Sequence, residues 1–347
     1  MTSTADRIAG CLKGVATGDA IGKQTEMLSR EDLLRWYPQG IRGFEGTPND
    51  VIPRYTGNSK RRWRIGETTD DTERTVAVAR AIIAERNVSH ATIGREMLGC
   101  LKSVHPGVQS LWEFHQAGDP MRIAKAHDGC GAAIRVAPVG IFYTSDRLDD
   151  LVTGAREASV STHGGSLAIA AAAATAAAVS AAIDGASSHD VLELAERAAA
   201  HAESRWPGGP ALAFANAIRI VHDDLMRSFG GPDKARPADL FGGPDKARPA
   251  DLPVLRPADV ASCCFPNQPM TIVPLALGLA TIMHSAEEAI LLAANIGGDS
   301  DSVGSIAGGI LGAIYPNTVN HAWYEVVERI NDHNLVTIAS ALGRLRH

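Results

Sequence analysis

Two acidic clusters, far apart in the sequence, contain the side chains best suited to chemistry in this chain. The first is ETTDDT at residues 67–72, and the second is DSDS at residues 299–302, directly after two glycines. Each cluster precedes a stretch with helical periodicity. Helix capping explains one or two such residues at a helix start, but it does not explain neighbouring carboxylates. Because clustered carboxylates are costly to bury without a cation, the pattern indicates a metal site.

The type of ligand limits the choice of metal. Both clusters offer carboxylate and hydroxyl oxygens, with no histidine or cysteine beside them. Oxygen ligands alone favour Mg²⁺, Mn²⁺ or Ca²⁺ over zinc. The spacing does not say whether the clusters meet in space, so one shared site and two separate helix caps both remain open at this point.

The elements that must position these clusters are helices. Apolar residues recur with a helical period over 5–16, 72–85, 188–202, 210–226, 270–284 and 286–296. The segment 305–314 is rich in small residues, as in a helix packed closely against neighbours, and no set of alternating strands stands out. The alanine-rich run 167–183 buries little area per residue, so it predicts a central core helix rather than a membrane span. The fold class expected is all-α.

Composition limits the class of protein. The chain has 347 residues, of which 45% are hydrophobic, and a net charge of −6 spread along the sequence. No basic stripe suited to nucleic acid is evident. The N-terminus carries Lys13 and Asp19 in its apolar stretch, unlike a signal peptide. The five cysteines lack zinc spacing and indicate free thiols in a reducing compartment. We therefore expect a cytoplasmic protein without a membrane partner.

A tandem repeat interrupts the helical pattern. FGGPDKARPADL occurs at 229–240 and again at 241–252, and RPAD follows at 256–259. A twelve-residue unit with two prolines and two glycines cannot form a helical repeat. We expect a single domain over 1–347 with a flexible insertion at 228–260. A tolerated surface insertion and a lid or docking arm are both open interpretations.

Several segments resemble the ADP-ribosylglycohydrolase family. They are GVATGDAIG at 14–22 followed by Glu26, TDDT at 69–72, GCGAAIR at 129–135 with PVG at 138–140, TH at 162–163, EEAI at 287–290 and GGDSDSVG at 297–304. The motifs come in the family's order and together are highly specific. The resemblance implies a compact orthogonal helical bundle with a dinuclear metal cleft that holds two Mg²⁺, with Mn²⁺ as an alternative.

The resemblance also implies roles for individual residues. The implied metal ligands are Thr69, Asp70, Asp71, Asp299, Asp301 and Ser302. The candidate catalytic carboxylates, which we do not rank, are Glu26, Asp70 and Asp301. The implied substrate-binding residues are Gly129, Cys130, Gly131, Arg135 and His163. Glycines at 129 and 131 let backbone N–H groups approach a phosphate. Arg135 could pair with a phosphate or with a structural partner.

Three departures from the family pattern bear on the substrate. Cys130 stands where the family usually has asparagine, and Thr68 replaces a frequent tryptophan. Ser302 replaces the commoner threonine and keeps the hydroxyl. The departures therefore affect the expected substrate more than the expected reaction. Trp63, among arginines, could stack on a base or lie on an exposed flank.

The resemblance implies hydrolysis of the glycosidic bond at C1 of ribose in an ADP-ribosylated side chain, most often arginine. Metal ions can hold the ribose hydroxyls and acidify a bound water, while a carboxylate stabilises positive charge at C1. An alternative is a metal-dependent N-glycohydrolase for a small nucleoside or nucleotide-like metabolite. A third possibility is a non-enzymatic, crystallin-like protein, which the intact acidic clusters disfavour. The expected partner is thus an ADP-ribosylated protein or a small ADP-ribose-like or nucleoside-like substrate.

Overall fold

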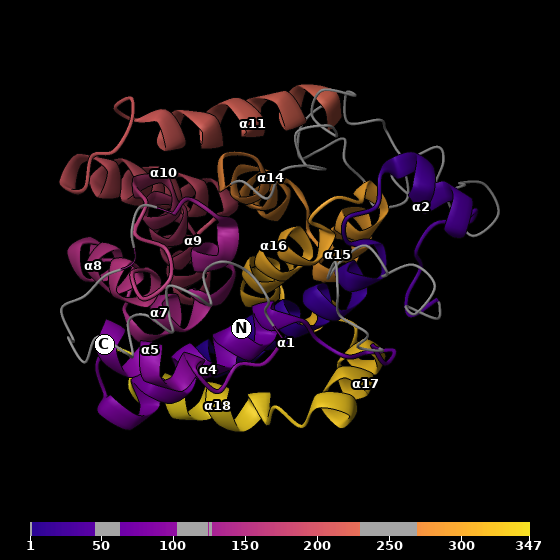
Figure 1. Cartoon of the computed structure of the whole chain (residues 1–347), viewed down its shortest axis with the longest axis horizontal. Coiled ribbons are helices and arrows are strands. Elements are labelled where there is room, and N and C mark those ends of the chain that lie inside the picture. Colours follow the sequence, from indigo (N-terminus) through magenta and orange to yellow (C-terminus); the bar gives the residue numbers. More distant parts are fainter. Residues whose placement is uncertain (1, 46–62, 103–123, 125–126, 230–268) are drawn as a thin grey trace.

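The computed structural model describes residues 2–45, 63–102, 124, 127–229 and 269–347. Within these residues every regular element is a helix, which confirms the all-α prediction (Figure 1). The α-helices are α1 (Thr4–Gly22), α2 (Arg30–Trp36), α4 (Asp70–Glu85), α5 (His90–Met97), α7 (Ala137–Phe142), α8 (Leu148–Ser159), α9 (Ser166–Asp184), α10 (Ser188–Arg205), α11 (Ala213–Phe229), α14 (Pro269–Ile282), α15 (Ala286–Ile296), α16 (Ser300–Ile314), α17 (His321–Asn331) and α18 (Leu335–Gly343). Short 3₁₀ turns are η1 (Lys23–Thr25), η2 (Cys130–Arg135) and η4 (Pro316–Thr318).

The helices expected from periodicity are all present, with shifted ends. The segment predicted at 5–16 extends to Gly22, and the one predicted at 305–314 begins at Ser300. These extensions contain glycine and acidic residues that lower helix propensity but fit the buried surroundings. The tandem repeat lies outside the described residues, apart from Phe229 at the end of α11. The single domain with an insertion stays a prediction.

The alanine-rich helix α9 forms the centre of one half of the molecule. It contacts α7, α8 and α10, and its residues from Ala168 to Ile183 are buried. Small side chains let these neighbours approach closely, so the helix contributes packing density rather than large side chains. Among the described residues it alone is long and apolar enough to cross a membrane, yet 89% of that window is buried inside the protein. That burial is the one expected of a core helix.

Helices α1 and α16 form the closest pair, and they lie side by side in the middle of Figure 1. Glycines recur every fourth residue along both, and each glycine of α1 faces the backbone of α16. A Cβ at Gly14 would lie 2.0 Å from the Gly308 oxygen, and a Cβ at Gly18 would lie 2.0 Å from the Gly304 oxygen. Because these contacts run in opposite directions along the two helices, the end of α1 meets the start of α16. This pairing brings the N-terminal motif to the second acidic cluster.

Candidate active site

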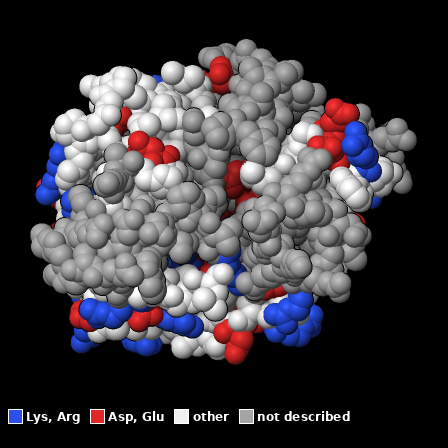
Figure 2. All heavy atoms as spheres, viewed as in Figure 1, with Lys and Arg blue, Asp and Glu red and all other residues white. Residues whose placement is uncertain are grey.

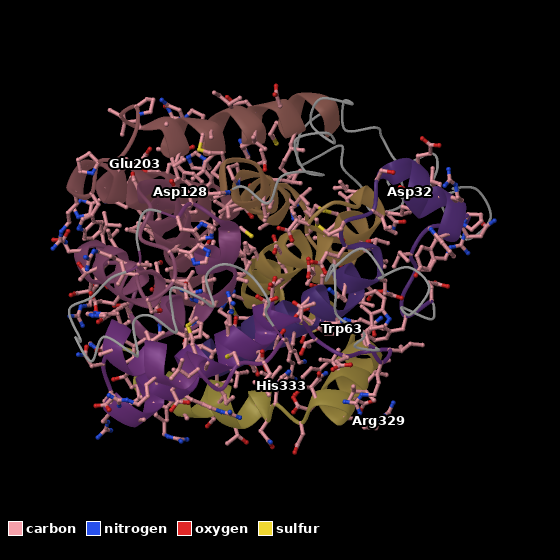
Figure 3. All side chains as sticks on the ribbon, viewed as in Figure 1. Asp32, Trp63, Asp128, Glu203, Arg329 and His333 are labelled. Carbon is pink, nitrogen blue, oxygen red and sulfur yellow. The ribbon has the colours of Figure 1, made fainter. Side chains whose placement is uncertain are left out.

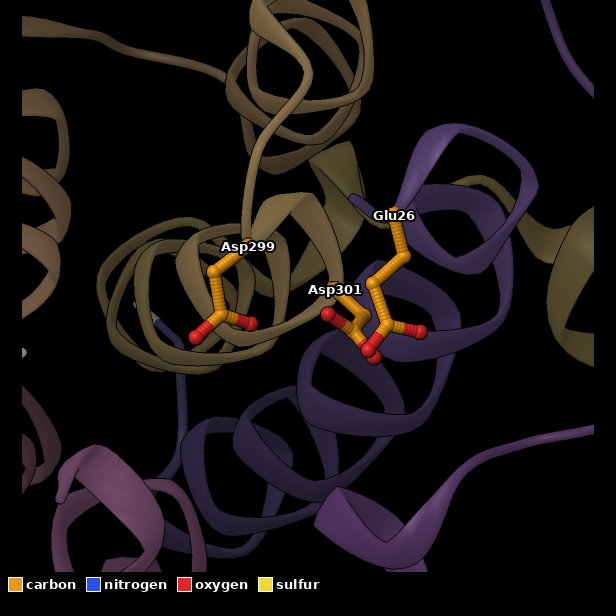
Figure 4. Close-up of side chains that lie close together, drawn as sticks. All are labelled: Glu26, Asp299 and Asp301. Atoms are coloured by element: carbon orange, nitrogen blue, oxygen red, sulfur yellow. The ribbon is translucent and has the colours of Figure 1, made fainter. Parts of the chain in front are cut away.

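Three carboxylates meet where α1 ends and α16 begins. Glu26 follows η1, while Asp299 caps α16 and Asp301 lies in its first turn. One carboxylate oxygen from each residue lies within 4.8 Å of the other two, and all three side chains are buried (Figure 4). Such a group of hard oxygen atoms has the ligand chemistry of Mg²⁺ or a similar cation.

A pair of backbone hydrogen bonds holds the two loops together at this point. The Met27 N–H donates to the Gly298 oxygen at 2.6 Å, and the Gly298 N–H donates to the Leu28 oxygen at 2.9 Å. Gly297 and Gly298 have φ values of +82° and +67°, a region that favours glycine. The Ser300 hydroxyl adds a bond to the Gly22 oxygen at 2.8 Å. The two glycines before the cluster therefore make the turn that faces Asp299 toward Glu26.

Asp19 positions the TDDT motif from outside that motif. This fully buried residue of α1 accepts hydrogen bonds from the Thr69 N–H at 2.8 Å and the Thr72 N–H at 3.0 Å, and from the Thr72 hydroxyl. The start of a helix presents unsatisfied N–H groups, and a carboxylate there is stabilising. Asp19 thus fixes the N-terminus of α4 against α1, which directs Asp70 and Asp71 toward the other cluster.

The two acidic clusters consequently share one pocket of about 100 Å³. Acidic atoms are visible near the middle of the face shown in Figure 2. The pocket is lined by Glu26, Asp70, Asp71, Arg74, His127, Gly129, Cys130, Gly131, Ile134, His163, Asp299, Asp301 and Ser302. The idea of two unrelated helix caps is therefore wrong, because helix packing joins them.

The electrostatics of the pocket fit a bound cation. Burial, followed by repulsion from Asp301, raises the pKa of Asp71 well above its ordinary value. Burial and Asp299 do the same to the pKa of Asp301, and burial and Asp301 to that of Glu26. The Asp71 Oδ2 atom is buried and has no hydrogen-bond partner among the described residues. A divalent cation would offset the repulsion and supply the partner that Asp71 lacks.

The other two implied ligands differ in their position. Ser302 lines the pocket, and its N–H donates to the Asp301 carboxylate at 3.0 Å. Thr69 is buried but does not line the pocket, and its hydroxyl accepts from the Asp71 N–H at 3.2 Å as the cap of α4. The Thr69 side chain thus has a helix-capping task, while metal ligation by either residue stays a prediction.

The pocket wall opposite the carboxylates is made of glycines and histidines. Gly129 and Gly131 leave room for His163, since a Cβ at Gly131 would lie 2.8 Å from its ring. The His127 ring packs against the His163 ring at an interplanar angle of 39°, with centroids 4.7 Å apart. Asp128, labelled in Figure 3, accepts from the Ala168 N–H of α9 at 3.1 Å and so ties this wall to the core. His127 was not among the predicted site residues.

Arg135, one of the predicted substrate-binding residues, does not line the pocket. The side chain is fully buried away from the pocket, where burial lowers its pKa to about 9. Its N–H groups donate to the oxygens of Gly131, Ala158 and Ser159 and to the Thr162 hydroxyl, at 2.7–3.1 Å. A guanidinium with its donors committed to these oxygens is structural.

Arg74 is the arginine that lines the pocket. Its Nη1 lies 3.5 Å from the Asp70 carboxylate one helical turn earlier, and its Nε has no hydrogen-bond partner among the described residues. The four-residue spacing from Asp70 was the signal in the sequence that could have found it. An available N–H donor beside the carboxylates suits an anionic part of a ligand.

The Cys130 side chain belongs to the glycine loop at 129–131 but points toward the second acidic cluster. Its Sγ donates to the Asp299 carboxylate at 3.4 Å and lies 3.8 Å from the Ser302 hydroxyl. Burial, with Asp299 nearby, raises the pKa of the thiol well above its ordinary value, so the sulfur stays protonated. The residue therefore lines the pocket as a weak neutral donor.

Fold and site together define an all-helical protein whose acidic pocket suits divalent cations. A family model described as ADP-ribosylglycohydrolase matches residues 1–347, and the chain belongs to this family of glycohydrolases. A solved structure described as "ADP-ribosylglycohydrolase-related protein complex" has a TM-score of 0.66 and 23% identity, covering 99% of each chain, which shows the fold.

Curated relatives are similar along different lengths. An uncharacterized protein, YegU, of Escherichia coli (strain K12) is 26% identical, covering 98% of this chain and 97% of that protein. The ADP-ribosyl-[dinitrogen reductase] glycohydrolase of Rhodospirillum rubrum is 27% identical over 145 residues, which are 40% of this chain and 45% of that protein. The named activity thus belongs to a relative that matches part of the chain.

Proposed function

We propose that this protein is a metal-dependent hydrolase that cleaves the glycosidic bond at C1 of ribose in ADP-ribosylated side chains, with arginine as the foremost substrate and two Mg²⁺, or Mn²⁺, as the metal. The observation that carries the proposal is the convergence of five carboxylates in one pocket, with the Asp71 Oδ2 atom buried and unpartnered. The family of the chain and its partial relative in Rhodospirillum rubrum support the ADP-ribosyl class of substrate.

We assign metal binding and catalysis to the carboxylate side of the pocket, and binding of the rest of the substrate to the other side. We assign the metal ions to Asp70, Asp71, Asp299 and Asp301, with Glu26, Thr69 and Ser302 next to them. Bound metal would supply positive charge that holds the ribose hydroxyls and acidifies water. The carboxylates stabilise the positive charge that develops at C1 as the bond to the leaving nitrogen lengthens. One of Glu26, Asp70 and Asp301 accepts a proton from the attacking water.

The opposite wall suits the rest of the substrate. His163 lines this wall with its ring nitrogens, Arg74 adds its guanidinium from beside Asp70, and Gly129 and Gly131 belong to the same pocket lining. We assign phosphate oxygens of the ADP-ribosyl group to this wall, with Arg74 taking the place first given to Arg135. Donors on one side and carboxylates on the other would orient the ribose with C1 above the metal ligands.

The alternative substrate is a small nucleoside or nucleotide-like metabolite. The observation in its favour is that Cys130 turns toward Asp299, which leaves no polar side chain at position 130 to hydrogen-bond a diphosphate. Both readings share the metal pocket and differ in the wall, so one assay with two sets of substrates separates them.

The test is release of ADP-ribose from ADP-ribosyl-arginine in the presence of Mg²⁺. We expect turnover that EDTA abolishes, and Asp301→Asn to lower kcat by at least about 100-fold while the fold is retained, because one negative charge of the site is lost. Asp190→Asn, which changes an exposed residue in the first turn of α10, is the control and should keep full activity. Wild-type activity in Asp301→Asn would refute the site, and turnover of nucleosides alone would select the alternative.

A further inference from the structure

The Thr162 hydroxyl connects the buried Arg135 to the pocket residue His163. The Arg135 Nη2 lies 2.7 Å from the Thr162 Oγ1, and the same oxygen lies 2.7 Å from the His163 Nδ1. All three side chains are at most 4% exposed. Because a guanidinium can only donate, one lone pair of the hydroxyl oxygen is taken by Arg135. The direction of the second bond, between the hydroxyl and the imidazole, then depends on where the hydroxyl proton goes.

Within the part of the chain that the structure describes, the only other acceptor in reach of that proton is the Ser159 carbonyl, at 3.4 Å. This oxygen already accepts from the Thr162 N–H at 3.0 Å, the His163 N–H at 2.8 Å and the Arg135 Nη2 at 3.1 Å. A carbonyl oxygen has two lone pairs, so a fourth and longer bond adds little. The hydroxyl proton is therefore better placed in the 2.7 Å bond to the His163 Nδ1.

We infer that Arg135 and Thr162 are positioning residues that fix the tautomer of His163. With Nδ1 accepting from Thr162, the proton of the neutral imidazole resides on Nε2. That nitrogen lies on the glycine side of the ring, since a Cβ at Gly129 or at Gly131 would be 3.0 Å from it. His163 thus presents an N–H donor along the wall of the pocket.

The consequence concerns the chemistry of the ligand, and here the inference rests on the proposed function. The floor of the pocket consists of carboxylates, which accept hydrogen bonds or bind cations. A histidine locked as a donor faces an oxygen acceptor, such as a phosphate or a ribose hydroxyl, rather than a donor group. His127 packs against the same ring at an angle of 39°. Arg135 lies outside the pocket, but through Thr162 and His163 it determines which hydrogen-bonding group the pocket offers to a ligand.

The test is nitrogen NMR of protein labelled with ¹⁵N-histidine, recorded without substrate at about pH 8.5, above the ordinary histidine pKa of about 6.5. His163→Gln assigns the signals. We expect the His163 Nδ1 to be unprotonated and shifted by an accepted hydrogen bond, with the proton on Nε2. Thr162→Val should move the Nδ1 signal to the position of an unbonded nitrogen, and Thr162→Ser should restore it.

The matched control is Thr175→Val, which removes an equally buried hydroxyl that bonds the Ala171 oxygen within α9 and should leave the His163 signals unchanged. A protonated Nδ1 in the wild-type protein would overturn the inference, and so would an Nδ1 shift unaffected by Thr162→Val. Neither readout needs turnover, so a failed activity assay and a failed tautomer assignment are distinguishable. In the active protein, Thr162→Val should raise KM several-fold and leave Mg²⁺ binding intact.

Discussion

Lys23 is a buried lysine that supplies positive charge beside the carboxylates. Its ammonium group pairs with Glu26 and lies 4.6 Å from the centroid of the Trp63 ring. Trp63, labelled in Figure 3, is 4% exposed, so neither base stacking nor an exposed flank describes it. An ammonium held between a carboxylate and an aromatic face is well stabilised without solvent. Lys23 therefore offsets part of the charge that the metal would otherwise neutralise alone.

We predict that Lys23→Met makes the protein more dependent on metal. Without a cation, Glu26 loses its partner inside the protein, and breaking a buried ion pair costs about 3–5 kcal/mol. With Mg²⁺ bound, the carboxylate has another positive partner, so the loss should be smaller. Thermal unfolding with EDTA and with Mg²⁺ measures both states, and the rise in Tm caused by Mg²⁺ should be larger in the variant than in the wild type.

Lys13→Met is the matched control for that experiment. Lys13 lies on the same helix and stacks over the Tyr324 ring at 4.8 Å, but it is far from the carboxylate cluster along α1. It should leave the effect of Mg²⁺ on Tm unchanged. Equal Mg²⁺ effects in Lys23→Met and in the wild type would show that Lys23 and the metal do not neutralise the same charge.

At the scale of elements, the contact between α1 and α16 decides the geometry of the site. Their glycines allow backbone-to-backbone contact, and the helix ends then carry Glu26 and Asp301 to the same place. A larger residue in this interface separates the helices and with them the carboxylates. Stability and metal affinity are consequently coupled through helix packing.

Gly18→Ala is the direct test of that coupling. Its Cβ would lie 2.0 Å from the Gly304 oxygen, a contact that the backbone must relieve by moving. Overpacking of this kind costs about 1–3 kcal/mol. We expect lower stability in urea and weaker Mg²⁺ binding by calorimetry. Gly209→Ala, where no atom lies within 4 Å of the added Cβ, should change neither. If Gly18→Ala is destabilised but binds Mg²⁺ with unaltered affinity, the packing of α1 against α16 does not control metal binding.

The same elements explain how far prediction from sequence could go. Periodic apolar residues located the helices, and the family motifs located the acidic clusters. The sequence does not predict which helices pack together, because periodicity indicates that one face of a helix is buried but not which element covers that face. Arg135 and Arg74 illustrate this limit. Arg135 ends the GCGAAIR motif and Arg74 follows the TDDT motif, yet the turn η2 directs Arg135 inward while α4 directs Arg74 into the pocket.

At the scale of the whole molecule, charge is distributed unevenly between surface and interior. Acidic and basic side chains alternate over the described part of the face in Figure 2, without a continuous basic surface. Inside, the pocket gathers carboxylates whose pKa values are raised by burial and mutual repulsion. The interior charge therefore links the stability of the fold to pH and to metal.

The sign of that link can be predicted. For Asp71, Asp299 and Asp301 the pKa in the folded protein is raised above the ordinary value of 3.8 by burial first and neighbouring carboxylates second. The folded state then binds protons more tightly than the unfolded chain, so their stabilising contribution is complete below about pH 4 and is lost as pH rises through the raised pKa values. Each proton released costs about 1.4 kcal/mol per pH unit.

Urea unfolding in EDTA between about pH 5 and 8 should show this contribution as a smaller loss of stability with pH in Asp71→Asn than in the wild type. Saturating Mg²⁺ should remove most of the difference between their slopes, because a bound cation lowers the pKa of its ligands. Identical slopes of the two proteins in EDTA would mean that Asp71 is not the strained carboxylate that its burial and missing partner imply.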